Sequence, residues 1–339
     1  MGSVKDLTII KEAKGNSAGI GRFIFSDRYS VFDWGEMPNH ISNKGKALCI
    51  IGAYFFEKLE KMGIKTHYRG IVEDNKLKRL METKKPANIM EVKLLRVIEP
   101  QIKDNTYDYS IYQNEKSNFL IPLEIIYRNY LPEGSSIFKR LKKGDITLED
   151  LGFDKVPSPD EKLKKTILDV STKLESTDRY IKWEEAQNIL NLSDKMIEKI
   201  KKITLLVNDL ITRETEKLSL INEDGKLEFG LDENRNLILV DVLGTPDECR
   251  FKFNNIPVSK EVARIFYRKT DWFKEVEEAK KKDSVGWKKI VKSSPPPLPQ
   301  RLNELISMLY QAFCNEITER KWFETPSLKE ILNEINDIL

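Results

Sequence analysis

Two carboxylates in the second half of the chain have the type and spacing to hold a metal ion. Glu228 lies within residues 227–231, a run of strand length, and Asp241 directly follows the apolar run 237–240. The polar residues 232–236 suit a turn, so the sequence predicts an antiparallel hairpin with both acids near one end of the sheet. Mg²⁺ prefers oxygen ligands and is commonly bound by one or two carboxylates plus substrate phosphates. The pattern therefore predicts a magnesium site, with a solvated surface hairpin as the alternative.

A glycine-containing turn near the amino terminus could approach a phosphate group. Residues 7–11 and 22–25 have strand composition, and Lys14 opens the stretch 14–21 between them. Glycine allows close approach of the backbone, and a lysine supplies a point charge. An ordinary hairpin is the alternative, and Lys11 is a second candidate for the charge.

Ordered segments of the chain resemble the SAICAR synthetase (phosphoribosylaminoimidazole-succinocarboxamide synthase) family. The segments that carry the resemblance are KLEFG at 226–230 with Asp241 and TPDECR at 245–250, SDRYSVFD at 26–33, ISNKGKAL at 41–48 with YFFEKL at 54–59, PLEIIYRNYL at 122–131 with Gly134 and Ser135, and ILDVSTKLESTDRY at 167–180. The resemblance covers roughly residues 14–272.

The resemblance implies an α+β fold of two lobes, an antiparallel β-sheet lobe and a larger α+β lobe, with an ATP cleft between them. It implies a cytoplasmic C–N ligase of purine biosynthesis that joins the carboxylate of carboxyaminoimidazole ribonucleotide (CAIR) to the amine of L-aspartate. ATP is cleaved to ADP and phosphate through an acyl phosphate, and Mg²⁺ is the cofactor. The partners are these three small molecules, without nucleic acid or membrane, and a homo-oligomer is left open.

The resemblance also assigns roles to particular residues. The expected catalytic and metal-binding residues are Lys226, Glu228 and Asp241, with Glu228 and Asp241 as the metal ligands. The expected ATP-binding residues are Lys14, Lys93, Leu120 and Lys173, and the expected substrate-binding residues are Ser30, Asp33, Arg128, Ser135, Lys226 and Arg250.

The chain departs from the family pattern at three places. The amino-terminal hairpin is shorter and richer in glycine, Val242 stands where a second acid usually follows the metal aspartate, and Thr177 precedes Asp178 where histidine is more common. Two other functions therefore stay open: a small-molecule kinase of similar two-lobed fold, and a non-catalytic nucleotide-binding homologue.

The pattern of apolar residues indicates the elements that position these groups. We expect a helix after 43 that is capped by residues 43–45, one or two amphipathic helices over 183–217, a helix over 258–280 and terminal helices over 301–321 and 327–339. Residues 101–117 are predicted to be a polar insertion, 167–180 a charged loop and 293–299 a proline-rich connector. The expected domains are an ATP-binding lobe at 1–124, a substrate and metal lobe at 125–292, and a connector with helices at 293–339.

Composition excludes several other classes. The 339 residues carry 57 lysines and arginines against 54 acids, so the net charge of +3 does not indicate a nucleic-acid surface. Three cysteines without CxxC spacing argue against a zinc site and a disulfide framework, which favours a reducing cytoplasm. The sequence shows neither a signal pattern at the amino terminus nor an apolar run long enough to span a membrane.

Overall fold

Two antiparallel sheets organise the chain in a computed structural model that describes residues 5–104, 106–283 and 286–339. The first sheet has the order β1-β2-β5-β3-β4. Its strands are β1 (Lys5–Lys11), β2 (Gly19–Phe25), β3 (Tyr68–Glu73), β4 (Lys76–Lys78) and β5 (Ile89–Leu94). This sheet comes entirely from the first third of the sequence.

The second sheet is larger and comes from the middle of the chain. Its order is β10-β9-β8-β11-β13-β14, and β12 also pairs with β11. Its strands are β8 (Phe119–Tyr130), β9 (Lys162–Thr172), β10 (Tyr180–Ile181), β11 (Ile221–Leu231), β12 (Leu237–Val240), β13 (Cys249–Phe253) and β14 (Ile256–Pro257). The predicted hairpin is confirmed as β11 and β12, although β11 begins earlier than expected. Because β9 runs through Thr172, the loop predicted over 167–180 is wrong for its first half.

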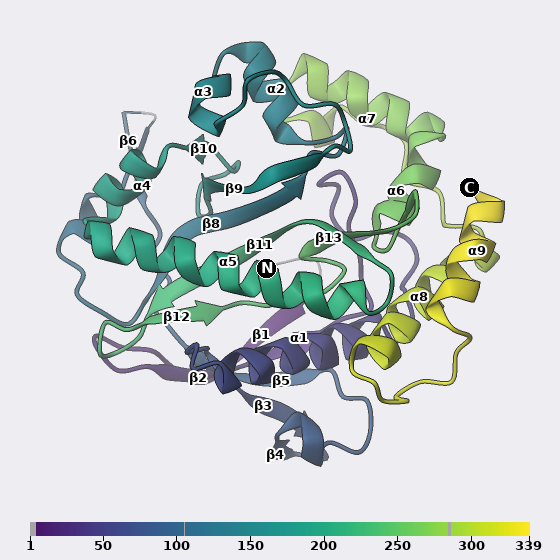
Figure 1. The fold of residues 1–339 in the computed structure, drawn as a ribbon, viewed down its shortest axis with the longest axis horizontal. Helices are drawn as coiled ribbons and strands as arrows, with labels where there is room; N and C mark the ends of the chain where they lie inside the picture. Colours follow the sequence, from purple (N-terminus) through teal and green to yellow (C-terminus); the bar gives the residue numbers. More distant parts are fainter. Residues whose placement is uncertain (1–4, 105, 284–285) are drawn as a thin grey trace.

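Helices pack around these two sheets (Figure 1). They are α1 (Lys44–Lys61), α2 (Ser136–Lys143), α3 (Leu148–Leu151), α4 (Trp183–Leu190), α5 (Asp194–Glu216), α6 (Glu261–Arg268), α7 (Asp271–Lys282), α8 (Gln300–Ile317) and α9 (Leu328–Ile338). Short 3₁₀ turns occur at Leu80–Glu82, Ser110–Gln113 and Trp287–Lys289. None of the helices in the described ranges is long and apolar enough to cross a membrane.

The helix α5 packs across β8 and β11 of the larger sheet (Figure 1). Its buried stripe includes Ile200, Val207 and Ile211, which recur at the spacing of a helical face. Each fully buried side chain of this size contributes roughly 1.5–3 kcal/mol of hydrophobic free energy. The amphipathic stretch predicted over 183–217 is confirmed as two helices, α4 and α5, because Ser193 caps the second one with its side chain.

The carboxyl-terminal helices were also predicted with nearly correct bounds. The helix α8 packs along α1, where Ser307 Oγ donates to the carbonyl oxygen of Ser42 at 2.7 Å, and α9 packs on α8. The helix predicted over 258–280 is interrupted, because Thr270 caps a new helix, α7. The proline-rich segment 293–299 forms neither helix nor strand, as expected for a connector.

The insertion 101–117 forms a small hairpin, β6 (Gln101–Lys103) and β7 (Thr106–Asp108), followed by a 3₁₀ turn. Asn105 of this predicted insertion lies outside the described residues. Tyr107 and Tyr109 reach the turn after β9, where Tyr109 Oη donates to Glu175 at 2.8 Å. At its other end Ser117 Oγ lies 3.2 Å from Asn16 Oδ1 of the glycine-containing turn. The insertion therefore ties together two turns that are remote in sequence.

The start of α1 depends on a residue that the sequence did not indicate. Asn43 is the N-cap residue, as predicted, but it has a left-handed backbone (φ 60°) and its side chain makes no capping hydrogen bond. Instead, the Asp27 carboxylate accepts hydrogen bonds from the amides of Asn43 (3.1 Å) and Gly45 (2.9 Å). A Cβ at Gly45 would lie 2.5 Å from the carbonyl oxygen of Phe25, so only glycine fits there.

We expect Asp27→Ala to lower the free energy of unfolding by about 1–2 kcal/mol, because it removes the acceptor for two amides at the amino end of α1. Urea denaturation monitored by circular dichroism measures this change. Asn43→Gly is the matched control and is expected to change stability by no more than a few tenths of a kcal/mol, since glycine adopts the left-handed conformation readily. A larger loss in Asn43→Gly than in Asp27→Ala would contradict the assignment of the cap.

Candidate functional site

A cleft of about 680 Å³ lies against one face of the larger sheet. Side chains of a β-strand alternate between faces, so Asp224, Lys226 and Glu228 of β11 share one face while Leu227 and Phe229 face the core. The antiparallel register extends this polar face to β8, because Glu228 pairs with Glu124 and Asp224 with Arg128. The floor of the cleft is therefore a patch of alternating acids and bases.

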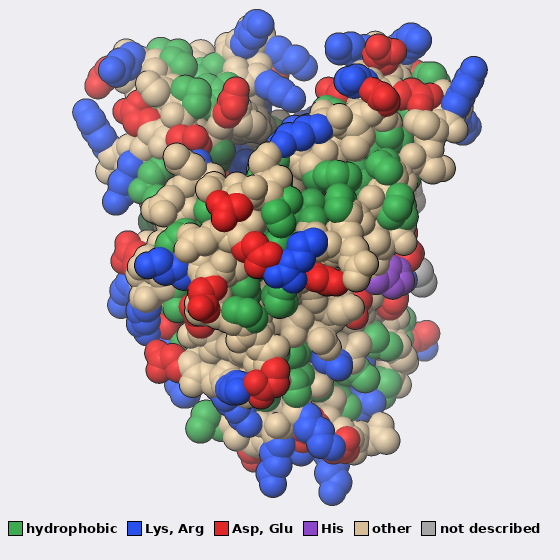
Figure 2. Space-filling model, turned by 90° about the vertical axis from the view of Figure 1, so that its right-hand side faces the viewer, with side chains coloured by type: hydrophobic (Ala, Val, Ile, Leu, Met, Phe, Trp, Pro, Cys, Tyr) green, Lys and Arg blue, Asp and Glu red, His purple; other side chains and the backbone are tan. Residues whose placement is uncertain are grey.

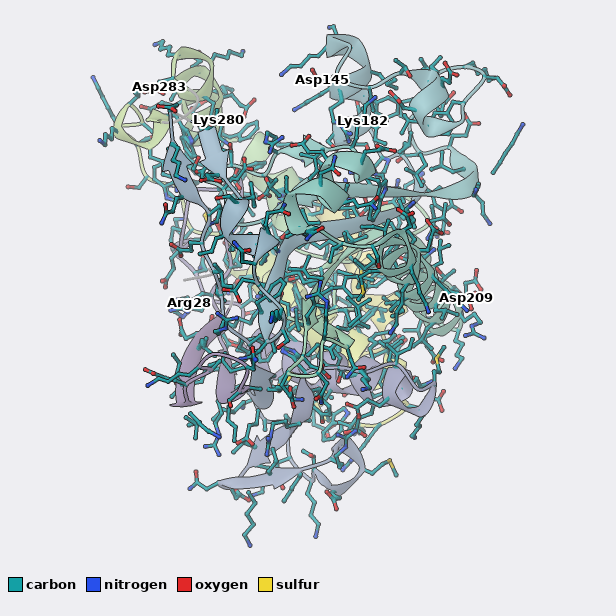
Figure 3. All side chains as sticks on the ribbon, turned by 90° about the vertical axis from the view of Figure 1, so that its left-hand side faces the viewer. Arg28, Asp145, Lys182, Asp209, Lys280 and Asp283 are labelled. Atoms are coloured by element: carbon teal, nitrogen blue, oxygen red, sulfur yellow. The ribbon has the colours of Figure 1, made fainter. Side chains whose placement is uncertain are left out.

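The smaller sheet supplies the facing wall of the cleft through Lys5, Asp6 and Leu7 of β1 and Phe23 of β2. Beyond the sheets, the molecule carries two projecting parts with a notch between them, and lysine and arginine side chains gather along the edges of the notch (Figure 2). Figure 3 places Lys280 of α7 on one projecting part and Asp145, which follows α2, on the other.

The two predicted metal ligands, Glu228 and Asp241, both line the cleft. Glu228 lies opposite Val240 in the β11–β12 register, so the next residue, Asp241, follows directly at the strand end. Asp241 has φ 62°, a conformation rare for residues other than glycine, and His67 Nε2 is within 2.9 Å of its carbonyl oxygen. Backbone strain of this kind clusters at functional sites, where surrounding contacts maintain it.

Lysines neutralise both acids. Lys173 forms an ion pair with Glu228, and Lys5 Nζ lies 2.6 Å from Asp241 Oδ1. Burial and the nearby charge of Asp241 raise the pKa of Glu228, although Lys173 opposes the shift. Burial also acts to raise the pKa of Asp241, but the charges of Lys5 and then Lys173 outweigh it and hold that pKa below its usual value. Two buried acids that repel each other in this way gain from a shared cation.

The carboxylates of Glu228 and Asp241 are of the ligand type that Mg²⁺ takes, but they are only two ligands. Carboxylate oxygens are the donors that Mg²⁺ prefers, and the ammonium groups of Lys5 and Lys173 already stand beside them as positive charges. Within the described residues no group of three or more His, Cys, Asp or Glu side chains is arranged to hold a metal ion by itself. Val242, at the position of the family's second acid, is buried and does not line the cleft. Two protein carboxylates would therefore act with substrate phosphates.

Lys226 and Glu124 also line the cleft, where they form an ion pair. Lys226 Nζ lies 3.1 Å from Glu124 Oε1 and 3.5 Å from Glu248 Oε2. The charge of Glu248 is the largest influence on Lys226, and with Glu124 it raises the pKa of the ammonium group even though burial opposes the shift. Lys226 is therefore a positively charged group on the cleft floor, held between Glu124 and Glu248.

Two predicted substrate residues, Arg128 and Arg250, share one acid. Arg250 Nε donates to Asp224 Oδ1 at 2.8 Å, and Arg128 Nη1 lies 3.4 Å from Asp224 Oδ2. Arg128 also lies 3.3 Å from Asp169 and 3.1 Å from Ser136 Oγ. Its buried Nε has no hydrogen-bond partner in the described part of the chain. Arg128 also lines the cleft, and a guanidinium group suits an anionic ligand such as a phosphate.

Other predicted site residues lie outside the cleft lining. Ser135 is buried and caps α2, where its Oγ accepts from the amide of Ile137, while its neighbour Ser136 makes the contact with Arg128. Ser30 Oγ accepts from the amide of Gly35 at 3.3 Å. The side chain of Asp33 is 90% exposed and lies 3.5 Å from Lys280.

Of the four predicted ATP-binding residues, one lines the cleft and three lie outside its lining. Lys173 lines the cleft, but the Lys14 side chain is 80% exposed and pairs with Glu12. Lys93 lies 3.0 Å from Glu233 at a separate hollow, and Leu120 packs beside Leu95. Lys5, whose side chain is only 20% exposed, instead lies in the cleft and pairs with Asp241.

Sequence reasoning missed several cleft residues: Lys5, Glu124, Asp224 and Glu248. Asp224 could have been found, because Asp224, Lys226 and Glu228 alternate with small or apolar residues at the period of a strand. No comparable signal marks Lys5, since its contact with Asp241 depends on how two sheets pack.

Comparisons with known proteins agree with this architecture. A family model described as SAICAR synthetase matches residues 14–284. A protein of Archaeoglobus fulgidus, provisionally named a phosphoribosylaminoimidazole-succinocarboxamide synthase, is 52% identical over 100% of both chains. The synthase of that name from Thermoplasma acidophilum is 31% identical over 88% of this chain and 93% of its own.

Solved structures have the same fold. The SAICAR synthase of Saccharomyces cerevisiae complexed with SAICAR has a TM-score of 0.64 at 20% identity and is covered over 94% of its length, with 95% of this chain. A SAICAR synthetase in complex with ADP has a TM-score of 0.60 at 22% identity, covering 95% of this chain and 97% of that one. The α+β fold class inferred from the sequence is thereby confirmed.

Proposed function

This chain belongs to the SAICAR synthetase family, whose members use ATP to join CAIR to L-aspartate in purine biosynthesis, and we propose that the cleft described above is where it does so. The observation that carries the proposal is the strand register that gathers Glu124, Lys226 and Glu228 beside Lys173 and Asp241. Paired acids and lysines on one rigid sheet face suit a reaction whose main requirements are positioning and neutralisation of charge.

We propose an acyl phosphate mechanism for the ligation. A carboxylate is a poor electrophile, so an oxygen of the CAIR carboxylate attacks the γ-phosphorus of ATP, and ADP leaves. The amine of L-aspartate then attacks the acyl carbon, and phosphate leaves. Lys226 and Lys173 lie where they can neutralise the CAIR carboxylate and the transferred phosphoryl group, and Arg128 and Arg250 can bind the sugar phosphate.

We assign Glu228 and Asp241 as the residues that would hold Mg²⁺. When bound, the ion would supply neutralisation of phosphate oxygens, as is general in phosphoryl transfer. The division into a lobe of residues 1–124, a lobe of 125–292 and a carboxyl-terminal segment of 293–339 also remains our proposal. A cytoplasmic location is proposed from the three buried free cysteines, Cys49, Cys249 and Cys314, which suit a reducing compartment.

Release of ADP, measured with each substrate omitted in turn, tests the proposed function. We expect release to require ATP, Mg²⁺, CAIR and L-aspartate together. Release with CAIR that is independent of L-aspartate would indicate a kinase, and ATP binding without any release would indicate a nucleotide sensor. Either result would contradict the ligase proposal.

We further propose that Lys5 contacts the ATP phosphates. We expect Lys5→Met to raise the KM for ATP roughly tenfold or more, because a charge-assisted hydrogen bond contributes about 1.5–3 kcal/mol. Steady-state kinetics with varied ATP measures the change. Lys14→Met is the matched comparison and is expected to leave the KM nearly unchanged, because that side chain is solvent-exposed. The reverse order of effects would assign the phosphate contact to Lys14 instead.

A further inference from the structure

Asp178 differs from the other carboxylates that line the cleft. The other lining acids each have a lysine or arginine partner: Asp6, Glu124, Asp224, Glu228, Asp241, Asp247 and Glu248. Asp178 lines the cleft too, but its carboxylate forms no ion pair and no hydrogen bond with any residue in the described ranges. A carboxylate in a functional cleft that is not satisfied by the protein is available to a cationic ligand.

The turn that carries Asp178 is held by hydrogen bonds on either side of this residue, while the side chain of Asp178 is exposed. Residues 173–179 connect β9 to β10, and the amide of Arg179 donates to Thr172 Oγ1 at 3.1 Å. The amide of Ser176 donates to Tyr107 Oη at 2.8 Å, and Arg179 pairs with Glu175. A held turn lowers the entropy cost of binding, because less backbone freedom remains to be lost.

The surroundings of Asp178 place it beside the proposed reaction centre. The charged groups that act on it are Glu124 of β8, Lys226 of β11, Lys173 of its own turn and Asp33 of the loop before α1. Burial and then the charge of Glu124 raise the pKa of Asp178, and Lys226 and Lys173 oppose the shift. A carboxylate whose pKa is raised is a better proton acceptor than one with an ordinary pKa.

The second half of the ligation requires such a group. The α-amine of L-aspartate is an ammonium ion at neutral pH and has no lone pair until it loses a proton. The lysines and arginines that line the cleft carry their charge as hydrogen-bond donors, and a protonated donor cannot take up that proton. Among the acids, those paired with cations are already committed to them.

We propose that Asp178 binds the ammonium group of L-aspartate and accepts one of its protons. This inference rests on the proposed function. The nitrogen lone pair then forms the C–N bond at the acyl carbon, and the bond from that carbon to the bridging phosphate oxygen breaks. Phosphate departs with the electron pair, and the second amine proton leaves with it as hydrogen phosphate.

The test compares two nucleophiles in the Asp178→Asn variant. Hydroxylamine is already uncharged at neutral pH, so it attacks an acyl phosphate without help from a base. We expect ADP release with ATP, Mg²⁺, CAIR and L-aspartate to fall about 10²-fold or more in kcat, with a higher KM for L-aspartate. Release with hydroxylamine in place of L-aspartate is expected to be unchanged, and Asp178→Glu should restore part of the L-aspartate activity.

Thr177→Ala is the control for disturbance of the turn, because Thr177 is exposed and does not line the cleft. It should retain full activity with both nucleophiles. Equal losses with L-aspartate and hydroxylamine in Asp178→Asn, or no loss with either, would overturn the inference. If the wild-type protein releases no ADP with either nucleophile, the proposed function itself fails, which distinguishes the two outcomes.

Discussion

Replacement of Glu228 by glutamine is expected to lower kcat by about 10³-fold, the scale seen when one preorganised electrostatic contact to a transition state is removed. Glutamine preserves the shape of the side chain but carries no negative charge for a cation. Glu228 is nearly inaccessible and directly opposite Glu124 in the sheet, so no other carboxylate can move into its place without rearranging the strands. Coupled measurement of ADP release determines the change.

The same substitution should cost little stability. Because burial and Asp241 raise the pKa of Glu228, its ionised form is already unfavourable in the folded protein, and the neutral amide relieves that repulsion. Lys173 keeps a second acid, Glu124, at 3.5 Å. We therefore expect the thermal unfolding temperature to stay close to that of the wild type while activity is lost, as is common at strained functional sites.

Glu223→Gln is the matched control for this experiment. Glu223 lies on the same strand, β11, and is also buried, but it pairs with Lys252 at 3.4 Å and does not line the cleft. The control should retain activity. Addition of Mg²⁺ should further stabilise the ATP-bound wild type but not the ATP-bound Glu228→Gln variant in thermal unfolding. Full turnover by Glu228→Gln would remove the metal assignment.

The elements of this fold were largely predictable because their signals are local. The hairpin of β11 and β12, the helices α4 and α5, and the terminal helices follow from apolar periodicity within single segments. The cleft positions of Lys226 and Glu228 on β11 followed as well, since alternate residues of one strand face the same way, and Arg128 of β8 also lines the cleft. The break between α6 and α7 was missed because one threonine cap decides it.

The parts that could not be predicted depend on contacts between distant segments. Asp27 caps α1 from 16 residues or more upstream, and Lys5 reaches Asp241 from another sheet. Neither contact leaves a periodic pattern in the sequence. The substrate-binding role predicted for Ser135 depended on a difference of one residue. Ser135 caps α2, whereas its neighbour Ser136 contacts Arg128.

Lys44 is the clearest example of a residue whose role appears only in three dimensions, and its loss should have the largest effect on stability. Its side chain is completely buried, 2.9 Å from Asp247 Oδ2, and it donates to the carbonyl oxygen of Arg28. We expect Lys44→Met to lower the free energy of unfolding by about 3–5 kcal/mol, because it leaves a buried carboxylate without its cation. Urea denaturation measures the loss.

Two further variants isolate the cause. Adding Asp247→Asn to Lys44→Met should recover part of the lost stability, since a neutral amide can still accept the hydrogen bond that Tyr310 Oη donates at 2.7 Å. Lys46→Met removes an exposed lysine two residues further along α1 and should change stability by less than about 0.5 kcal/mol. A double variant that is less stable than Lys44→Met would contradict an electrostatic origin.

The pH dependence gives the sharpest test of this ion pair. Burial acts to raise the pKa of Asp247, but Lys44, then Lys260 and the hydrogen bond from Tyr310, outweigh it and hold the pKa below its usual value. In the wild type the carboxylate therefore contributes stability above its unfolded pKa of about 3.9 and loses that contribution as the pH falls below it. Without Lys44, only Lys260 and Tyr310 oppose burial, so we expect the folded pKa to lie above the unfolded value. Protonation then stabilises the variant as the pH falls through that raised pKa, so the difference in unfolding free energy between Lys44→Met and wild type should shrink from neutral to mildly acidic pH. A difference that stays constant or widens would show that Lys44 acts through packing rather than through its charge.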